Sequence, residues 1–193
     1  MKRFERRDLP NVYQPAEDSH LLATAVTPQL HPDSFVLEVG VGSGYVAEYV
    51  REHAGVHVVG CDINPEACRQ TRERGIPAVR GDLLAPFRDR SFDAVVFNPP
   101  YLPTPPEQEW DDPMEHALSG GEDGRRLVRP FLRDVRRVLR PDGAVYLLVS
   151  SLTDIDAVVG LAESNGFEAE EIADESFPFE RLVALKLLQS IRE

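Results

Sequence analysis

The sequence is poor in cysteine and contains no long apolar runs. Cys61 and Cys68 are its only cysteines, and no cluster of cysteine and histidine accompanies them, so neither a disulfide framework nor a metal site is indicated. No stretch approaches the uninterrupted apolar length of a membrane span. The first residues also lack the apolar segment of a signal peptide. We therefore expect a cytoplasmic protein that does not bind membranes.

Lysine is even scarcer in relation to its usual frequency. Only Lys2 and Lys186 are lysine among 21 basic residues, whereas 33 residues are acidic and the net charge is −12. At very high salt, carboxylates stay hydrated and their mutual repulsion is screened. This charge balance favours a halophilic protein. Acidity alone does not exclude nucleic acid as a partner, since its phosphates repel an acidic protein strongly only at low ionic strength.

The length of 193 residues suits one domain with a single core. Short apolar, β-branched runs predict strands at 35–39, 57–62, 78–80, 92–97, 144–149, 167–172 and 182–188. Helical spacing of apolar residues predicts helices after residue 16, at 45–53, after residues 62–65, at 127–139 and at 155–165. Pro141, Asp142 and Gly143 are expected to close the helix at 127–139.

The alternation of strands and helices predicts the fold class. We expect an α/β protein with a doubly wound, mostly parallel seven-stranded sheet and an antiparallel final strand. Residues 1–12 are expected to be a flexible lead-in to this one domain. The stretch 102–124 is rich in proline, acid and glycine and is too long for a plain connection, so we expect a substrate-facing loop.

The segment Asn98, Pro99, Pro100 and Tyr101 follows a predicted strand. Two prolines cannot continue a ladder, so the segment should lie at the carboxyl edge of the sheet, where open α/β sheets bind ligands. The Asn98 side chain and the rigid proline peptides offer carbonyls that can accept both hydrogens of a planar NH2 group. The Tyr101 ring can stack on the same group. Such a nitrogen is a poor nucleophile, and positioning supplies much of its catalysis.

A glycine-rich turn, 40–44, follows the first predicted strand. Glycine lets the backbone approach a ligand closely, and a helix begins behind the turn. The spacing of Gly42, Gly44 and Ala47 also fits a dinucleotide fingerprint. The carboxylate of Glu38 would repel a pyrophosphate but suits the cationic amino group of S-adenosylmethionine. We therefore expect S-adenosylmethionine as the cofactor rather than NAD.

An acid follows or ends each of three successive predicted strands. After Glu38, Asp62 stands where it can accept the hydroxyls of a ribose, and Asp82 could accept from an adenine amino group. Glu17 and Asp18 open the first helix, where the helix dipole favours carboxylates. We interpret these two as capping residues rather than site residues.

Together these segments resemble the class I S-adenosylmethionine-dependent methyltransferases. More narrowly, they resemble the HemK-like glutamine methyltransferases, in the short archaeal and eukaryotic form that modifies class 1 translation release factors. The markers are Tyr13-x-Pro15-x-Glu17-Asp18-Ser19, Leu37 to Gly44, Asp62-Ile-Asn-Pro65, Asn98-Pro-Pro-Tyr101 and Gly120-Gly-x-x-Gly-Arg125. The first and last markers discriminate, whereas amino-group methyltransferases acting on nucleic acids share the middle three.

The resemblance implies a substrate, a set of contacts and a partner. The substrate would be the glutamine of a Gly-Gly-Gln motif in a release factor, with its amide held by the residues from Asn98 to Tyr101. The expected contacts of the methyl donor are Ser19, Glu38, Gly40, Gly42, Asp62, Asp82, Leu83 and Asn98. The resemblance also implies a heterodimer with a small zinc-binding activator protein that pairs with a sheet edge, for which Val79 is a candidate.

The residues by themselves reach only a planar NH2 group as the methyl acceptor. A glutamine amide, adenine N6 and guanine N2 all satisfy that description, so N-methylation of DNA or RNA is the alternative function. Against it, the chain has no added target-recognition domain, no basic stripe and no aromatic platform beyond Tyr101. A non-catalytic scaffold is disfavoured, because the acids and the Asn-Pro-Pro-Tyr segment are intact.

The charge balance generates a first prediction. The midpoint of thermal unfolding should rise by several degrees between low and molar KCl, because screening relieves the repulsion among carboxylates. Circular dichroism melts at graded KCl concentrations measure this shift. A midpoint that stays level or falls with added KCl would argue against salt adaptation.

Overall fold

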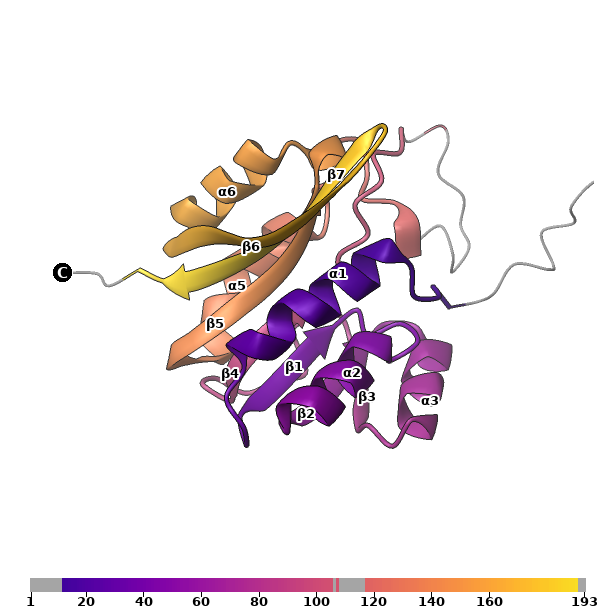
Figure 1. Ribbon diagram of the computed structural model, residues 1–193, viewed down its shortest axis with the longest axis vertical. Helices are drawn as coiled ribbons and strands as arrows, with labels where there is room; N and C mark the ends of the chain where they lie inside the picture. Colours follow the sequence, from indigo (N-terminus) through magenta and orange to yellow (C-terminus); the bar gives the residue numbers. More distant parts are fainter. Residues whose placement is uncertain (1–11, 106, 108–116, 191–193) are drawn as a thin grey trace, which may run out of the picture.

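The computed structural model describes residues 12–105, 107 and 117–190 (Figure 1). Within these residues one seven-stranded sheet has the order β3-β2-β1-β4-β5-β7-β6. The parallel strands are β1 (Phe35–Val39), β2 (His57–Asp62), β3 (Ala78–Arg80), β4 (Phe92–Phe97) and β5 (Leu139–Ser150). Strand β7 (Glu180–Gln189) runs antiparallel between β5 and β6 (Phe167–Phe177). The predicted fold class is confirmed.

Helices cover both faces of the sheet. On one face lie α1 (Glu17–Val26) and α2 (Tyr45–Ala54), and on the other α5 (Val128–Val138) and α6 (Ile155–Ser164). Helix α3 (Pro65–Glu73) packs against β2 and β3. The structure also has two short 3-10 turns, η2 (Thr27–Gln29) and η4 (Ser151–Thr153). None of the described helices is long and apolar enough to cross a bilayer.

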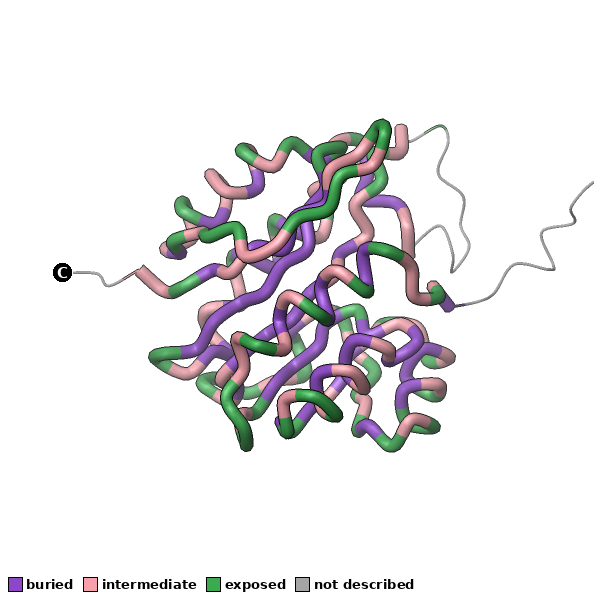
Figure 2. The backbone as a smooth tube through the Cα atoms, viewed as in Figure 1, coloured by how far each residue is buried: buried purple, intermediate pink, exposed green. Residues whose placement is uncertain are grey.

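Each face of the sheet has its own apolar core, and the central strands between them are buried (Figure 2). In the α5–α6 core, the rings of Phe97 and Phe131 lie 4.6 Å apart between centroids. The other core joins Leu22 of α1 and Val50 of α2 to the sheet. Burial of each such side chain stabilises the fold by about 1.5–3 kcal/mol. The two cores hold the carboxyl ends of the strands in fixed positions.

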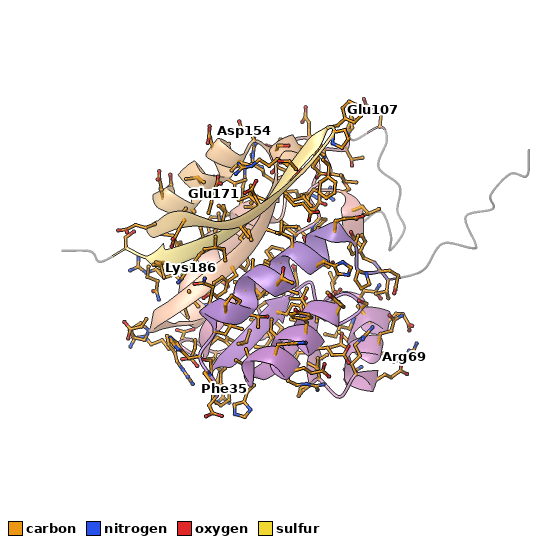
Figure 3. The ribbon with its side chains drawn as sticks, in the orientation of Figure 1. Phe35, Arg69, Glu107, Asp154, Glu171 and Lys186 are labelled. Carbon is orange, nitrogen blue, oxygen red and sulfur yellow. The ribbon has the colours of Figure 1, made fainter. Side chains whose placement is uncertain are left out.

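Polar contacts tie α1 and η2 to the far side of the sheet. Lys186 on β7, labelled in Figure 3, donates from Nζ to Oε1 of Gln29 over 2.9 Å. Tyr146 on β5 donates from its hydroxyl to the Gln29 backbone carbonyl over 3.4 Å. The 3-10 turn that follows α1 is therefore anchored on β5 and β7.

The predicted strands 35–39, 57–62, 78–80 and 92–97 have the observed bounds of β1 to β4. Helix α5 ends at Val138, and β5 begins at Leu139 rather than at the predicted residue 144, so the segment 141–143 that was expected to close the helix belongs to the strand. Phe92 pairs with Leu139 and Ala94 with Ala144, so a bulge takes up the residues between. Proline is tolerated there because the bulge interrupts the regular ladder. Strand β6 is also longer than predicted, since it pairs with β7 up to their connecting turn, past a bulge.

Two predicted loop segments are only partly described. Residues 1–11 of the expected lead-in lie outside the described residues, whereas Val12, its last residue, is buried. Positions 106 and 108–116 of the expected substrate-facing loop also lie outside them. The two ends of that loop are described, and they meet where Leu102 bridges to Ser119.

The pairing register shows where the carboxyl ends of the central strands meet. Val39, at the end of β1, pairs with Cys61 on one side and with Phe97 on the other. The chain leaves β1 towards β2 and later returns to its other side with β4, so the strand order reverses at β1. In open α/β sheets a crevice forms at this switch point, beyond the carboxyl ends of the strands.

Candidate active site

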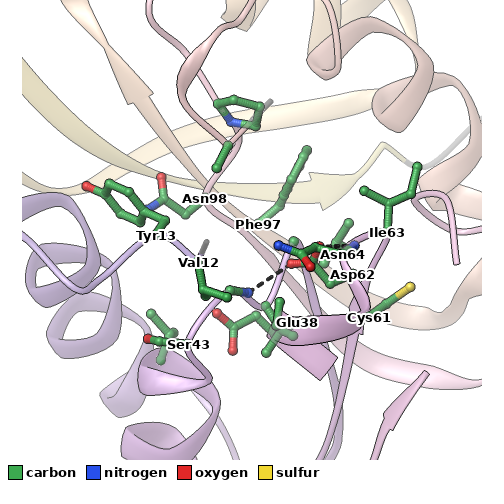
Figure 4. A pocket seen from close by; sticks show the side chains of 18 of the residues that line it. Val12, Tyr13, Glu38, Ser43, Cys61, Asp62, Ile63, Asn64, Phe97 and Asn98 are labelled. Carbon is green, nitrogen blue, oxygen red and sulfur yellow. Dashed lines mark hydrogen bonds between the residues drawn. The ribbon is translucent and has the colours of Figure 1, made fainter. Parts of the chain in front are cut away.

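A cavity of about 350 Å³ lies at the switch point, at the carboxyl ends of β1, β2 and β4 (Figure 4). It is lined by all eight residues predicted to contact the methyl donor: Ser19, Glu38, Gly40, Gly42, Asp62, Asp82, Leu83 and Asn98. The volume is in the range of sites that bind small molecules. The structure therefore brings together residues from five separate stretches of the sequence.

The glycine turn forms the floor of the cavity behind α2. Gly42 has φ +52° and Gly44 has φ +82°, a backbone region that L side chains rarely adopt. A Cβ at Gly44 would also lie 3.1 Å from the Cα of Thr71 on α3. Arg74 donates from Nε to the carbonyl of Ser43 over 2.8 Å and holds the turn from the same side. The turn is thus fixed by close packing against α3 and by the hydrogen bond from Arg74, the residue at the end of that helix.

Asp62 organises the next part of the rim. Its Oδ2 accepts from the backbone N–H of Gly42 over 3.0 Å, and its Oδ1 accepts from that of Asn64 over 2.8 Å. Burial raises the pKa of Asp62, and these backbone N–H groups oppose the rise. Asn64 in turn caps α3 by accepting from the N–H of Glu66 over 2.9 Å. The predicted helix start after Asp62 is confirmed, and the carboxylate stays at the cavity.

Glu38 is the most deeply buried acid of the cavity, with 5% of its surface exposed. Within the described part of the chain, its Oε2 has no hydrogen-bond partner. Burial raises the pKa of Glu38 well above its ordinary value, an N–H from Ala47 lowers it in part, and repulsion by Asp62 adds to the rise. A buried carboxylate oxygen without a donor fits a cationic ligand group, which would supply both the hydrogen and the opposite charge.

Asn98 carries the second unpartnered acceptor. Its Nδ2 donates to Asp18 Oδ2 over 3.0 Å, while its Oδ1 is buried and has no partner among the residues that the structure describes. Figure 4 shows Asn98 and Tyr13 near each other at one end of the cavity, and Asp62 with Asn64 at the other. Pro100 also lines the cavity, whereas Pro99 is buried and Tyr101 is half-buried beyond the lining. Stacking by Tyr101 stays a prediction.

Sequence reasoning missed Asp18. Capping is the wrong interpretation, because Ala16 is the N-cap of α1 and no side chain caps the helix. Asp18 is instead buried, and its carboxylate bonds to Tyr13 and Ser19 as well as to Asn98. The available signal was its place in the 13–19 marker. Without that marker, an acid in the first turn of a helix is expected to face solvent.

The glycines of the 120–125 marker pack against Tyr101 and the residue that follows it. A Cβ at Gly124 would lie 2.5 Å from the Tyr101 carbonyl oxygen and 2.4 Å from Cγ2 of Thr153, so only glycine fits. Gly120 donates its N–H to the Leu102 carbonyl over 2.8 Å, and Leu102 donates to the Leu118 carbonyl over 3.0 Å. The glycines therefore act by backbone packing against the acceptor segment.

Comparison with known proteins bears on this cavity. The family described as a methyltransferase domain matches residues 36–119, which run from β1 past β4. The MJ0928 protein of Methanocaldococcus jannaschii, provisionally named a protein N5-glutamine methyltransferase, is 35% identical over 182 residues, which cover 91% of each chain. The chain belongs to the protein N5-glutamine methyltransferase family. The resemblance drawn from the sequence markers is thereby confirmed.

Two further known proteins are similar to this chain. The release factor glutamine methyltransferase of Moorella thermoacetica is 34% identical over 158 residues, which cover 74% of this chain and 56% of that protein. The solved E. cuniculi Mtq2–Trm112 complex is described as responsible for methylation of the termination factor eRF1. Its matching chain has a TM-score of 0.77 and 30% identity, covering 94% of this chain and 100% of that one.

Membership makes this protein an S-adenosylmethionine-dependent enzyme. The cavity fits that cofactor on two independent observations. The unpartnered Glu38 oxygen suits the amino group of the methionine moiety, and the glycine turn leaves backbone exposed where a side chain would fill the space.

The raised pKa of Glu38 generates the second prediction. The folded protein retains a proton on Glu38 that the unfolded chain releases, so this residue's contribution to stability falls as pH rises from its unfolded to its folded pKa. At mildly alkaline pH, Glu38→Gln should therefore unfold at higher urea than the wild type. The same change should weaken S-adenosylmethionine binding by about 10- to 100-fold, because glutamine keeps an acceptor oxygen but lacks the negative charge that strengthens a hydrogen bond to a cationic group.

Urea titration and calorimetric titration with S-adenosylmethionine measure the two effects. Glu163→Gln is the matched control, because Glu163 is exposed on α6 and lies outside the cavity lining. A Glu38→Gln variant that is destabilised yet binds S-adenosylmethionine normally would contradict the assignment.

Proposed function

We propose that this enzyme transfers a methyl group from S-adenosylmethionine to the side-chain amide nitrogen of the glutamine in the Gly-Gly-Gln motif of a class 1 translation release factor. The observation that carries the proposal is the buried, unpartnered Oδ1 of Asn98 at the cavity. The activities named for the Moorella and E. cuniculi relatives support this substrate. Release factors act on ribosomes, so we assign the reaction to the cytoplasm.

The donor would occupy the part of the cavity between the glycine turn and Asp82. Glu38 would bind its amino group, Asp62 its ribose hydroxyls and Asp82 its adenine amino group. Gly40 and Gly42 would leave room for it beside the backbone. Ser19 and Leu83 would complete the contacts. When bound, S-adenosylmethionine supplies an electrophilic methyl group on a sulfonium.

The acceptor amide would enter beside Asn98. Oδ1 of Asn98 would accept one hydrogen of the target NH2 group, and a carbonyl of the rigid Pro99–Pro100 segment would accept the other. These two bonds would orient the nitrogen and raise its electron density. The nitrogen is a weak nucleophile in water, so this orientation is the main contribution of the protein to the rate. The methylated nitrogen is acidic enough to release its proton to water.

Transfer of a radiolabelled methyl group tests the proposal. The enzyme, with its activator and at high salt, should label release factor but neither DNA nor RNA. Replacement of the motif glutamine by asparagine should abolish labelling, and Asn98→Ala should lower kcat by about 10²- to 10³-fold, as removal of one preorganised hydrogen-bonding group does. Labelling of nucleic acid would favour the alternative function, and an unlabelled release factor would refute the proposal.

We further propose a heterodimer with a small zinc-binding activator that pairs with the free edge of β3. Strand β3 ends the sheet, so one side of its backbone has no strand partner. Val79 on this strand is 37% exposed, and Ile63, which follows the neighbouring strand β2, is 62% exposed. The E. cuniculi relative forms a complex with Trm112. An edge strand with exposed apolar side chains is suited to pairing with another chain.

The edge assignment predicts that Val79→Glu weakens the heterodimer by about tenfold or more, as loss of a central interface residue does. Leu188→Glu is a matched control, because Leu188 is 41% exposed but lies on the interior strand β7. Co-elution with the activator measures assembly, and S-adenosylmethionine binding checks that each variant is folded. Equal effects of the two substitutions would exclude the β3 edge.

A further inference from the structure

The carboxylate of Asp18 collects hydrogen-bond donors from three parts of the site. Tyr13 donates its hydroxyl hydrogen to it, with oxygens 3.0 and 3.1 Å away. Ser19 donates from its backbone N–H over 2.6 Å and from its hydroxyl over 3.1 Å. Asn98 donates from Nδ2 over 3.0 Å. Asp18 itself is 4% exposed, so water supplies little of its solvation and these donors replace it.

This arrangement determines what the neighbours can offer a substrate. An ionised carboxylate only accepts, so every group that touches Asp18 must turn a hydrogen towards it. A carboxamide that directs its NH2 group to Asp18 directs its oxygen the other way, and Oδ1 of Asn98 is the atom left without a partner. A phenol has a single hydrogen, so the Tyr13 oxygen keeps only lone pairs for the cavity that Tyr13 lines.

Nearby negative charges also make the acceptor end of the cavity favour a hydrogen-bond donor. Asp18 and Glu180 both lie close enough to Tyr13 and Tyr101 for their negative charges to raise the pKa of each phenol, with burial as the larger cause. Glu180 is held in place by Ser150, which donates its hydroxyl to Oε1 over 2.6 Å. The acceptor end of the cavity therefore presents lone pairs and negative potential.

We propose that Asp18 is a positioning residue that sets the specificity of the acceptor end, so that the site takes a glutamine amide and rejects the isosteric carboxylate of glutamate. An amide nitrogen brings two hydrogens to the oxygens of Asn98 and its neighbours. A carboxylate brings only lone pairs and a like charge, which leaves buried acceptors facing each other. Sites built to bond a donor hydrogen reject analogues that lack it much more strongly than apolar pockets reject a missing methylene.

The inference rests on the proposed function, and binding rather than turnover tests it. The activator-bound enzyme, loaded with S-adenosylhomocysteine, is titrated with release factor carrying the motif glutamine and with the same protein carrying glutamate there. The wild type should bind the glutamine form about 100-fold more tightly or better, as expected for a site that bonds the missing hydrogens. Failure of both forms to bind would count against the proposed function, whereas equal binding of both would overturn the inference alone.

The substitution that separates positioning from a structural role is Asp18→Asn. The introduced amide can donate to Asn98, so Asn98 can turn its NH2 group to the cavity, and one negative charge is removed. The ratio of the two affinities should fall by about tenfold or more. A purely structural role would weaken both forms alike and leave the ratio unchanged, and that result would overturn the inference.

Glu17→Gln is the matched control, because it removes one charge from the same helix turn at an exposed position without a bond to Asn98. Its ratio should stay within about twofold of the wild type, since a screened surface charge contributes little. A comparable fall in this control would also overturn the inference. If Asp18→Asn fails to bind S-adenosylhomocysteine, Tyr13→Phe takes its place and should lower the ratio about threefold, while an unchanged ratio would again reject the inference.

Discussion

The hydrogen bond from Asn98 Nδ2 to Asp18 Oδ2 joins the end of β4 to the first turn of α1, across 80 positions of sequence. The Asp18 side chain is buried. A hydrogen bond to a charged group contributes about 1.5–3 kcal/mol. Its larger effect is directional, because it decides which atom of the Asn98 amide faces the cavity. The anchoring of η2 by Lys186 and Tyr146 supports the same helix from its opposite end.

Two buried side-chain oxygens lack a partner among the described residues, Oε2 of Glu38 and Oδ1 of Asn98, and both residues line the cavity. A buried polar atom without a partner costs about 1–3 kcal/mol. The protein therefore carries its unfavourable polar burial where ligands are proposed to bind. Satisfying these oxygens on binding would recover that cost and favour the bound complex over the free enzyme.

Much of this architecture could be predicted from the sequence, because local signals and tertiary packing agree there. Strands β1 to β4 are short apolar runs bounded by glycine, proline or acid, and their predicted bounds match those observed. The bulge before Ala144 could not be predicted, because proline and glycine at 141–143 indicate a turn whenever the pairing partner is unknown. The glycine turn and the three acids were found because each lies at or just beyond the end of a recognisable strand.

Asp18 shows where sequence reasoning ended. An acid in the first turn of a helix satisfies a simple local rule, and only the fold reveals that Tyr13 and Asn98 surround it. The glycines at 120–124 were recognised as a marker, but their reason is equally non-local, since the carbonyl of Tyr101 occupies the space beside Gly124. In both cases the deciding neighbour lies more than 20 positions away or on another element.

The contact between Gly124 and Tyr101 has a consequence for the design of chimaeric proteins. The Tyr101 carbonyl and Cγ2 of Thr153 leave no room for a Cβ at position 124, so these three residues depend on one another. A chimaera between relatives must therefore take Tyr101, Gly124 and Thr153 from the same parent. A crossover that separates Tyr101 from Gly124 would pair a carbonyl and a glycine that were not fitted to each other.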